Sequence, residues 1–259
     1  MKEYILITGA SSGIGFEMAQ LLAAKEFNLI LVARSIDKLK KMQTDLSIKY
    51  DIEVQYFQVD LSNVYSSLEL YESIKANEWA VSHLVNNAGF GDYGSFLETS
   101  LEKEIDMINL NISSLMTLTK LFAKDMAERK SGRIMNVASL LSFIPFPYYS
   151  VYSATKAFVL AFSETIAAEL EGTGVVVTTL CPGTVETPFH TPNMRKTTAM
   201  STNKPVPAID VARAGVKLLL KGKGKKVVGF NNWFISNLPR VTPDSIMMKI
   251  KKNLATIKS

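Results

Sequence analysis

The stretch YILITGASSGIGF, residues 4–16, decides the fold. An apolar run leads into a turn that contains Gly9, Gly13 and Gly15, and a helical pattern follows at once. A strand, a glycine-rich turn and a helix in this order bring free backbone N–H groups and a helix N-terminus to one point, which suits a pyrophosphate. Gly9 suits the tight turn, Gly13 the close approach of a phosphate, and Gly15 the close packing of helix on strand. The stretch therefore predicts a dinucleotide-binding unit, and an ordinary strand-to-helix turn is the alternative.

The same alternation of short apolar runs and longer amphipathic segments continues along the chain. Strands that are apolar on both faces and joined by helices imply a parallel sheet that is covered on each side. We therefore expect an α/β fold with a single Rossmann domain, residues 1–259, whose doubly wound parallel sheet of about seven strands has helices on both faces. The expected strands are residues 4–8, 28–33, 53–60, 83–86, 132–138, 175–181 and 225–230, and the expected helices are residues 13–25, 37–50, 64–76, 101–129, 149–171 and 208–221.

The composition excludes several classes of protein. The chain has 259 residues, and its 47% hydrophobic content is enough for a full core, so a disordered or fibrous protein is excluded. Cys181 is the one cysteine, which allows no internal disulfide and fits a reducing compartment. The spacing of Cys and His offers no zinc site, and neither a signal peptide nor an apolar run of membrane-spanning length is recognisable. We expect a soluble, cytoplasmic protein without a metal.

Two segments depart from the regular alternation. Residues 184–207 are rich in Pro and Thr, and a long irregular segment inside a compact domain is usually functional, so we expect a substrate lid. Residues 213–259 carry eleven Lys and Arg against one acid, a net charge of +10, whereas the first 212 residues carry −5. Such asymmetry can mark a contact with nucleic acid or a membrane.

The basic extension, residues 231–259, supplies few of the interleaved aromatic side chains that are typical of nucleic-acid binding, so the sequence disfavours that partner. Residues 245–257 have an amphipathic pattern. This tail is compatible with docking a partner subunit, with peripheral contact to an anionic membrane surface, with binding the phosphates of an acyl-CoA, or with a solubilising role alone.

Further motifs follow the expected strands in order. Asp60 follows the third strand, Asn86-Asn87-Ala88-Gly89 the fourth, Ser139 the fifth and Pro182-Gly183 the sixth, while Asn111 and Tyr152-x-x-x-Lys156 lie on helices. With these motifs and its Gly-x-x-x-Gly-x-Gly turn, the chain resembles the short-chain dehydrogenase/reductase family from Tyr4 to about Gly183. The resemblance implies a nicotinamide-dependent oxidoreductase.

The end of the second strand bears on the choice of nicotinamide cofactor. Ala33 stands where an acid would bind the ribose 2′-OH, and Arg34 follows, whose guanidinium suits a 2′-phosphate. We therefore expect NADP(H) to be preferred over NAD(H); the alternative is that Arg34 only begins a solvated loop. The cofactor-binding residues implied by the motifs and the resemblance are Gly9, Ser11, Ser12, Gly13, Ile14, Gly15, Arg34, Ser35, Asp60, Leu61, Asn87, Ala88, Gly89, Tyr152, Lys156, Pro182, Gly183, Val185 and Thr187.

Four residues form the expected catalytic set. Tyr152 and Lys156 lie four apart on a helix and so share one face, where the Lys156 ammonium would lower a tyrosine pKa of about 10. Ser139 follows a strand at the ligand-binding edge of the sheet and can hold the substrate oxygen. The resemblance implies that Asn111, with Asn109 as the alternative, distorts its helix and holds a water that links Lys156 to solvent. We expect hydride reduction of a carbonyl to a secondary alcohol, with Tyr152 as general acid/base.

The substrate and the partners are less sharply defined. The candidate pocket residues imply a small apolar ketone or 3-oxoacyl compound, and His190 is expected to be a plain loop histidine. The resemblance implies a homodimer or homotetramer through helices 101–129 and 149–171. A catalytically silent NADPH-binding regulatory or scaffold protein is the alternative function. The pocket candidates are Phe90, Tyr93, Leu140, Leu141, Phe143, Ile144, Phe146, Tyr148, Tyr149, Phe189, Met194 and Met200.

Overall fold

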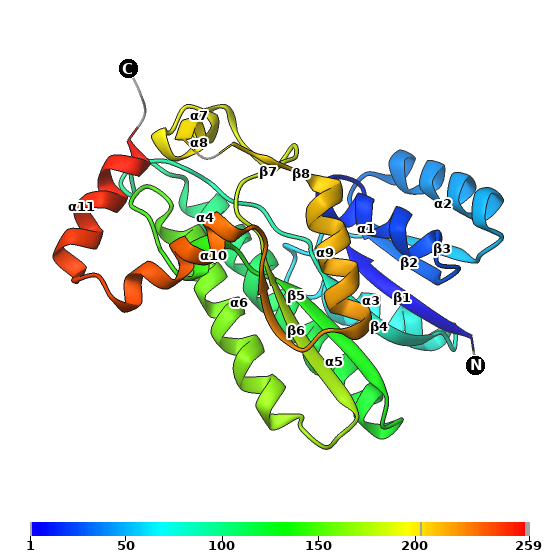
Figure 1. Cartoon of the computed structure of the whole chain (residues 1–259). Coiled ribbons are helices and arrows are strands. Elements are labelled where there is room, and N and C mark those ends of the chain that lie inside the picture. Colours follow the sequence, from blue (N-terminus) through cyan, green and yellow to red (C-terminus); the bar gives the residue numbers. More distant parts are fainter. Residues whose placement is uncertain (1, 203, 257–259) are drawn as a thin grey trace.

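A parallel β-sheet forms the centre of the protein. The computed structural model describes residues 2–202 and 204–256 (Figure 1). Within these residues, seven parallel strands pair in the order β3-β2-β1-β4-β5-β6-β9. The chain reverses its direction of winding at β1, and such a switch point opens a crevice at the carboxyl ends of the strands. The strands are β1 (Glu3–Thr8), β2 (Asn28–Ala33), β3 (Val54–Gln58), β4 (Ala80–Asn86), β5 (Gly132–Val137), β6 (Val175–Cys181) and β9 (Gly224–Val227).

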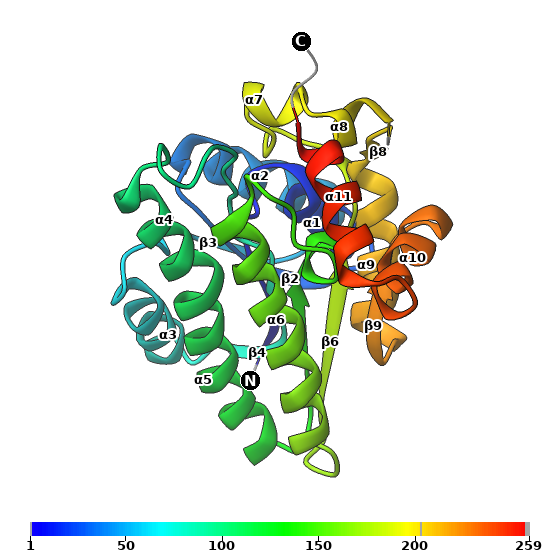
Figure 2. The same ribbon diagram turned by 90° about the vertical axis from the view of Figure 1, so that its left-hand side faces the viewer.

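Helices cover both faces of the sheet (Figure 2). Side chains alternate along β1, so Ile5 and Ile7 pack with α1, α2 and α9, whereas Tyr4 and Leu6 pack on the other face with α3, α5 and α6. Both sets are buried, which explains why β1 reads as a continuous apolar run. The expected doubly wound α/β fold is confirmed. The covering helices are α1 (Gly13–Ala23), α2 (Ile36–Tyr50) and α9 (Ala208–Lys221) on one face and α3 (Ser66–Ala76), α5 (Leu115–Glu128) and α6 (Ser150–Glu169) on the other.

Two elements of the structure differ from those that the sequence predicts. The helix expected at 101–129 consists of α4 (Leu101–Ile108), a π-helical segment (Asn109–Ser114) and α5. The strand expected at 225–230 ends at Val227, because Gly229 adopts φ +92° and turns the chain into α10 (Phe230–Asn237). The apolar pattern around Phe230 therefore belongs to a helix, and a left-handed glycine made the difference.

The expected lid, residues 184–207, is more regular than a loop. It contains β7 (Val185–Glu186) and β8 (Val206–Pro207), which pair in parallel, and the short helices α7 (Pro192–Arg195) and α8 (Thr198–Thr202).

After α10, the chain continues through a 3₁₀ turn (Leu238–Arg240) into α11 (Asp244–Ala255), which confirms a helix in the expected amphipathic stretch; residue 257 of that stretch lies outside the described residues. The helix α11 packs against α8 (Figures 1 and 2). None of the helices in residues 2–202 and 204–256 has the length and apolar character needed to cross a membrane.

Candidate active site

A cavity of about 1080 Å³ lies at the carboxyl edge of the sheet, bordered by the loops that follow β1, β2, β4, β5 and β6. Every residue expected to bind the cofactor lines this cavity except Gly15. The expected catalytic residues Ser139, Tyr152 and Lys156 line it too, whereas Asn111 does not. One cavity thus brings together residues from the first and the sixth strand of the chain.

The glycine turn after β1 has the geometry that an anion needs. Gly9 and Gly13 adopt φ +66° and +56°, and α1 begins at Gly13 with its N-terminus at the cavity. Ser12 is the N-cap of α1, yet its hydroxyl makes no capping hydrogen bond and remains available to a ligand. A Cβ on Gly15 would lie 2.4 Å from the Gly9 carbonyl oxygen, so Gly15 permits close packing, as expected, and does not touch the cavity. This cradle fits a pyrophosphate.

The loop after β4 is tied to the glycine turn. The Thr8 hydroxyl accepts hydrogen bonds of 3.0 Å from the N–H groups of Asn87 and Ala88. The Asn87 amide in turn donates to the carbonyl oxygens of Thr8 and Gly9, at 3.0 and 3.2 Å. These bonds hold two walls of the cavity in fixed register, so the asparagine that the sequence assigns to the cofactor also builds the site.

The end of the cavity beside β2 and β3 carries charged and polar side chains. Asp60 accepts hydrogen bonds from the N–H and the hydroxyl of Ser62, at 3.0 and 2.8 Å. Burial opposes ionisation of Asp60, but these bonds and the nearby Arg34 charge hold the pKa of the carboxyl below its usual value. Arg34 and Ser35 are exposed at the rim, where a guanidinium and a hydroxyl can meet a phosphate.

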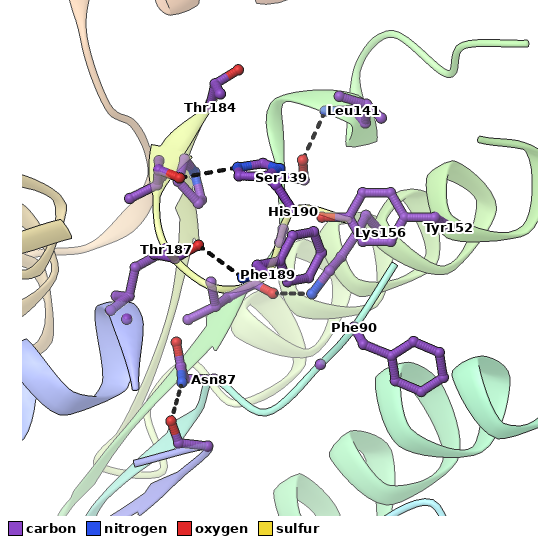
Figure 3. A pocket seen from close by; sticks show the side chains of 18 of the residues that line it. Asn87, Phe90, Ser139, Leu141, Tyr152, Lys156, Thr184, Thr187, Phe189 and His190 are labelled. Atoms are coloured by element: carbon purple, nitrogen blue, oxygen red, sulfur yellow. Dashed lines mark hydrogen bonds between the residues drawn. The ribbon is translucent and has the colours of Figure 1, made fainter. Parts of the chain in front are cut away.

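Tyr152 and Lys156 project from α6 into the cavity near Ser139 (Figure 3). The Lys156 ammonium donates to the Val137 carbonyl oxygen at 2.8 Å. The Ser142 hydroxyl donates to the Lys156 carbonyl oxygen at 2.7 Å, which fixes α6 to the turn that carries Ser139. The three expected reacting side chains therefore converge, although they come from different elements.

Burial dominates the electrostatics of this centre. It raises the pKa of Tyr152 to about 12, and a hydrogen bond with Ser139 offsets part of that rise. Burial also lowers the pKa of Lys156 to about 8. The lowering of the Tyr152 pKa that the sequence predicts from Lys156 is therefore not seen, because burial shifts this pKa upward. Tyr152 is a neutral phenol at pH 7 and holds the proton that a general acid must give.

Asn111 lies behind the reacting centre rather than in it. It is fully buried in the π-helical segment, so the expected distortion of its helix is present. Its side chain donates to the Phe90 carbonyl at 2.9 Å and accepts from the Phe90 N–H at 3.2 Å. A Cβ on Gly89 would lie 2.9 Å from Asn111 Oδ1 and 3.4 Å from Lys156 Nζ, so the two side chains flank Gly89. Asn111 therefore positions the loop after β4.

The substrate end of the cavity is apolar. The Phe189 ring packs on the Tyr152 ring with centroids 5.6 Å apart. The prediction that the cavity is lined by Tyr93, Phe143 and Tyr148 was wrong. The Tyr93 ring packs on the Tyr149 ring with centroids 5.0 Å apart, and Phe143 packs against a core cluster. The expected pocket residues that do line the cavity are Phe90, Leu140, Leu141, Ile144, Phe146, Tyr149, Phe189, Met194 and Met200.

The C-terminal segment supplies lining residues that the sequence did not reveal. Phe230, Phe234 and Ile235 of α10 and Leu254 of α11 all border the cavity. The amphipathic period showed that this segment had an apolar face but gave no clue to what that face would cover.

His190 also lines the cavity, where its Nε2 lies 3.0 Å from the Val185 carbonyl oxygen and burial lowers its pKa. Within the described part of the chain, no three His, Cys, Asp or Glu side chains gather as a metal site requires.

The chain is similar in sequence to known oxidoreductases. The very-long-chain 3-oxoacyl-CoA reductase of Anas platyrhynchos is 32% identical over 261 residues, which cover 97% of this chain and 80% of the relative. The 17-beta-hydroxysteroid dehydrogenase type 3 of Rattus norvegicus is 35% identical over 194 residues, which cover 73% of this chain and 62% of the relative.

Solved structures of other proteins are similar to this one. A short-chain dehydrogenase from Sphingobium yanoikuyae in complex with NADPH has a TM-score of 0.80 at 25% identity, with 95% of each chain covered. A 7beta-hydroxysteroid dehydrogenase has a TM-score of 0.84 at 22% identity, with 96% of each chain covered, and shares the fold. The family model of the short chain dehydrogenases matches residues 3–198. The chain belongs to the short-chain dehydrogenase family of oxidoreductases.

Proposed function

We propose that this protein reduces an apolar ketone or 3-oxoacyl compound to a secondary alcohol with NADPH, and that Tyr152 is the general acid/base. One observation carries the proposal: Ser139, Tyr152 and Lys156 meet in the middle of a single cavity that has a phosphate cradle at one end and apolar walls at the other. The names of the relatives, a 3-oxoacyl-CoA reductase and a hydroxysteroid dehydrogenase, support a carbonyl carbon within a large apolar skeleton.

The cofactor end favours NADPH. The glycine turn and the N-terminus of α1 would hold the pyrophosphate, Asp60 the adenine, and Arg34 with Ser35 the 2′-phosphate. The solved relative with bound NADPH supports this choice. When bound, NADPH supplies the hydride for the carbonyl carbon.

The protein's own residues move the proton. The Ser139 hydroxyl holds the substrate oxygen, and Tyr152 donates its proton to that oxygen as the carbonyl carbon is reduced. The Lys156 ammonium stabilises the phenolate left behind, and a water held near Asn111 returns the proton through Lys156. In reverse, the same groups oxidise a secondary alcohol.

A panel of carbonyl compounds tests the proposal, with NADPH absorbance followed for each and NADH run in parallel. We expect turnover of apolar ketones or 3-oxoacyl thioesters, loss of at least a hundredfold in kcat in Tyr152→Phe, and nearly unchanged NADPH binding in that variant. Lys156→Met should weaken both turnover and NADPH binding. NADPH binding with no turnover of any compound would instead favour the regulatory or scaffold function.

We also propose a cytoplasmic location and a homodimer or homotetramer. The buried thiol of Cys181 fits a reducing compartment. Exposed apolar side chains on α4, α5 and α6, among them Ile105, Met116 and Phe158, offer a face that a second copy can cover. Sedimentation velocity of the wild type and of Phe158→Ser measures this association.

A further inference from the structure

Exposed apolar side chains gather on the C-terminal segment. A soluble monomer usually scatters such side chains singly, yet here they occupy α10, α11 and the turn between them. Both helices lie at one end of the molecule, and α2 lies at the other (Figure 1). We call this group the C-terminal surface. It comprises Phe230, Trp233, Phe234, Val241, Ile246, Met248 and Ile250, with exposed fractions from 45% at Ile250 to 81% at Val241.

The exposed face of α11 is separate from the face that packs on the protein. Met247 and Ala255 are buried, while Ile246, Met248 and Ile250 are about half exposed. At 3.6 residues per turn, Ile246 and Ile250 lie on one flank of the exposed side and Met248 on the other, with basic residues between them. The helix is therefore anchored by one side, and these three apolar side chains leave about half of their surface in water. Large apolar side chains left in water on a folded helix indicate a surface that another apolar phase covers.

Basic residues interleave with these apolar ones. Arg240, Lys249, Lys251 and Lys252 stand against Asp244, the one acid between residues 213 and 259. Lysines beside aliphatic and aromatic side chains are typical of helices that lie in the interface of an anionic bilayer. A nucleic-acid surface would place aromatic platforms beside the basic residues. Here the exposed aromatic side chains lie on α10, whereas the apolar neighbours of the α11 lysines are aliphatic and cannot stack on bases.

The same surface borders the substrate cavity. Phe230 and Phe234 are exposed and also line the cavity, and Leu254 of α11 lines it from the buried side. Two aromatic side chains thus belong both to the C-terminal surface and to the lining of the cavity. A lipid layer that covered this surface would lie directly beside the apolar end of the cavity.

We propose that the C-terminal surface binds the anionic face of a lipid bilayer, and that the apolar substrate enters the cavity from the lipid. The second half rests on the proposed function, whereas the binding of lipid does not. Membrane binding in this form is peripheral, through α10 and α11, and leaves the catalytic cavity facing the bilayer surface.

Cosedimentation of the full chain with vesicles tests the binding, with no cofactor or substrate added. We expect binding to phosphatidylcholine vesicles that contain phosphatidylserine, weaker binding without phosphatidylserine, and release by salt. The double variant Lys249→Ser with Lys252→Ser should bind at least tenfold more weakly. The matched control is Lys40→Ser with Lys41→Ser, which removes two exposed lysines from α2 at the opposite end. An equal effect of the two double variants, or no binding of the wild type, would overturn the proposal.

Trp233 reports which face touches the lipid. The variant Trp79→Phe leaves Trp233 as the one tryptophan, because the sequence has two. Vesicles of brominated lipid should quench Trp233 and shift its emission to the blue. In Trp233→Phe, the remaining Trp79, which packs on Tyr4 and Phe57, should stay unquenched. Vesicle binding with an unquenched Trp233 would mean that another face binds.

Two other occupants of the surface give different results. If a second copy covers it, Ile246→Ser with Ile250→Ser would convert a dimer to a monomer in sedimentation velocity and leave vesicle binding unchanged. If acyl-CoA phosphates occupy it, the Lys249→Ser with Lys252→Ser variant would raise the KM for an acyl-CoA with vesicle binding intact. Either result overturns the proposal, whereas vesicle binding without turnover would contradict only the proposed function.

Discussion

The hydroxyl of Tyr93 donates a hydrogen bond of 2.6 Å to the carbonyl oxygen of Ala255, 162 residues further along the chain. This bond joins the loop after β4 to the last turn of α11. The segment 184–207 is joined to the same point, because the Thr198 N–H donates to the Thr256 carbonyl oxygen at 3.0 Å. The C-terminal helix is therefore a wall of the cavity that is held in place by two segments of the domain.

Tyr93→Phe should loosen this wall and leave the chemistry intact. A hydrogen bond of this kind contributes about 1 kcal/mol to the stability of the fold. Tyr93 does not line the cavity, so its loss removes no contact with the substrate. We expect a KM for the apolar substrate that rises several-fold, an almost unchanged kcat, and faster proteolysis of the C-terminal segment. Tyr65→Phe is the control, because it removes the hydroxyl of an exposed tyrosine. A fall in kcat without a change in KM would contradict the role of the bond.

Arg34→Ser should reduce the preference for NADPH. A hydrogen bond to a charged group contributes about 1.5 to 3 kcal/mol, so we expect the KM for NADPH to rise between about tenfold and a hundredfold. The KM for NADH should stay the same, because NADH has no 2′-phosphate. Steady-state kinetics with both cofactors measure this, with Lys40→Ser as the control for a change of surface charge. Equal effects on NADH and NADPH would show that Arg34 does not recognise the phosphate.

Gly91→Ala should disturb Tyr152 directly. A Cβ at Gly91 would lie 2.9 Å from Tyr152 Cδ2 and 3.1 Å from Phe189 Cζ, so the tyrosine ring must shift. Misplacing a reacting group by a fraction of an ångström to 1 Å costs about ten- to a hundredfold in kcat. NADPH binding should be unchanged, since Gly91 does not line the cavity.

Gly94→Ala is the matched control for Gly91→Ala. Its Cβ would meet only the Thr99 methyl group, at 2.8 Å, in the same loop but away from Tyr152. A similar fall in kcat in the two variants would mean that any added methyl group in this loop lowers kcat, and that the effect does not come from the Tyr152 ring.

His83 should make the fold sensitive to acid. Burial, helped by the charge of Arg133, lowers the pKa of His83 from 6.5 to about 4. Between these values the unfolded chain binds a proton that the folded chain does not, so stability falls as the pH drops from about 6.5 to about 4, by at most about 3 kcal/mol. Urea unfolding at a series of pH values measures this.

His83→Phe keeps an aromatic ring against Phe27, which His83 contacts edge-on with centroids 5.9 Å apart, and removes the titration. We expect a shallower loss of stability below pH 6.5 in this variant. The remaining slope belongs to other groups, including His190, whose pKa burial also lowers. Identical pH profiles for the variant and the wild type would show that His83 does not titrate in this way.

The local features of this protein could be read from its sequence. Alternating apolar and amphipathic segments predicted the doubly wound sheet, because a strand buried on both faces must be apolar throughout. The glycine turn and Ser139 were predicted because the carboxyl ends of parallel strands meet at one edge, and Tyr152 and Lys156 because their motif resembles that of a known family. The four-residue spacing of Tyr152 and Lys156 fixes a shared helix face.

Other features arise only when distant segments pack. Gly229 turns an expected strand residue, Phe230, into the start of a helix, and α11 reaches the cavity through Tyr93 and the segment 184–207. Burial raises the pKa of Tyr152 from 10 to about 12. The sequence by itself thus determined the glycine turn, the residues at the strand ends and the helix face that Tyr152 and Lys156 share, because turn chemistry and helix period are local. Only the tertiary structure decided what encloses them, because burial and the choice of a packing partner depend on the whole chain.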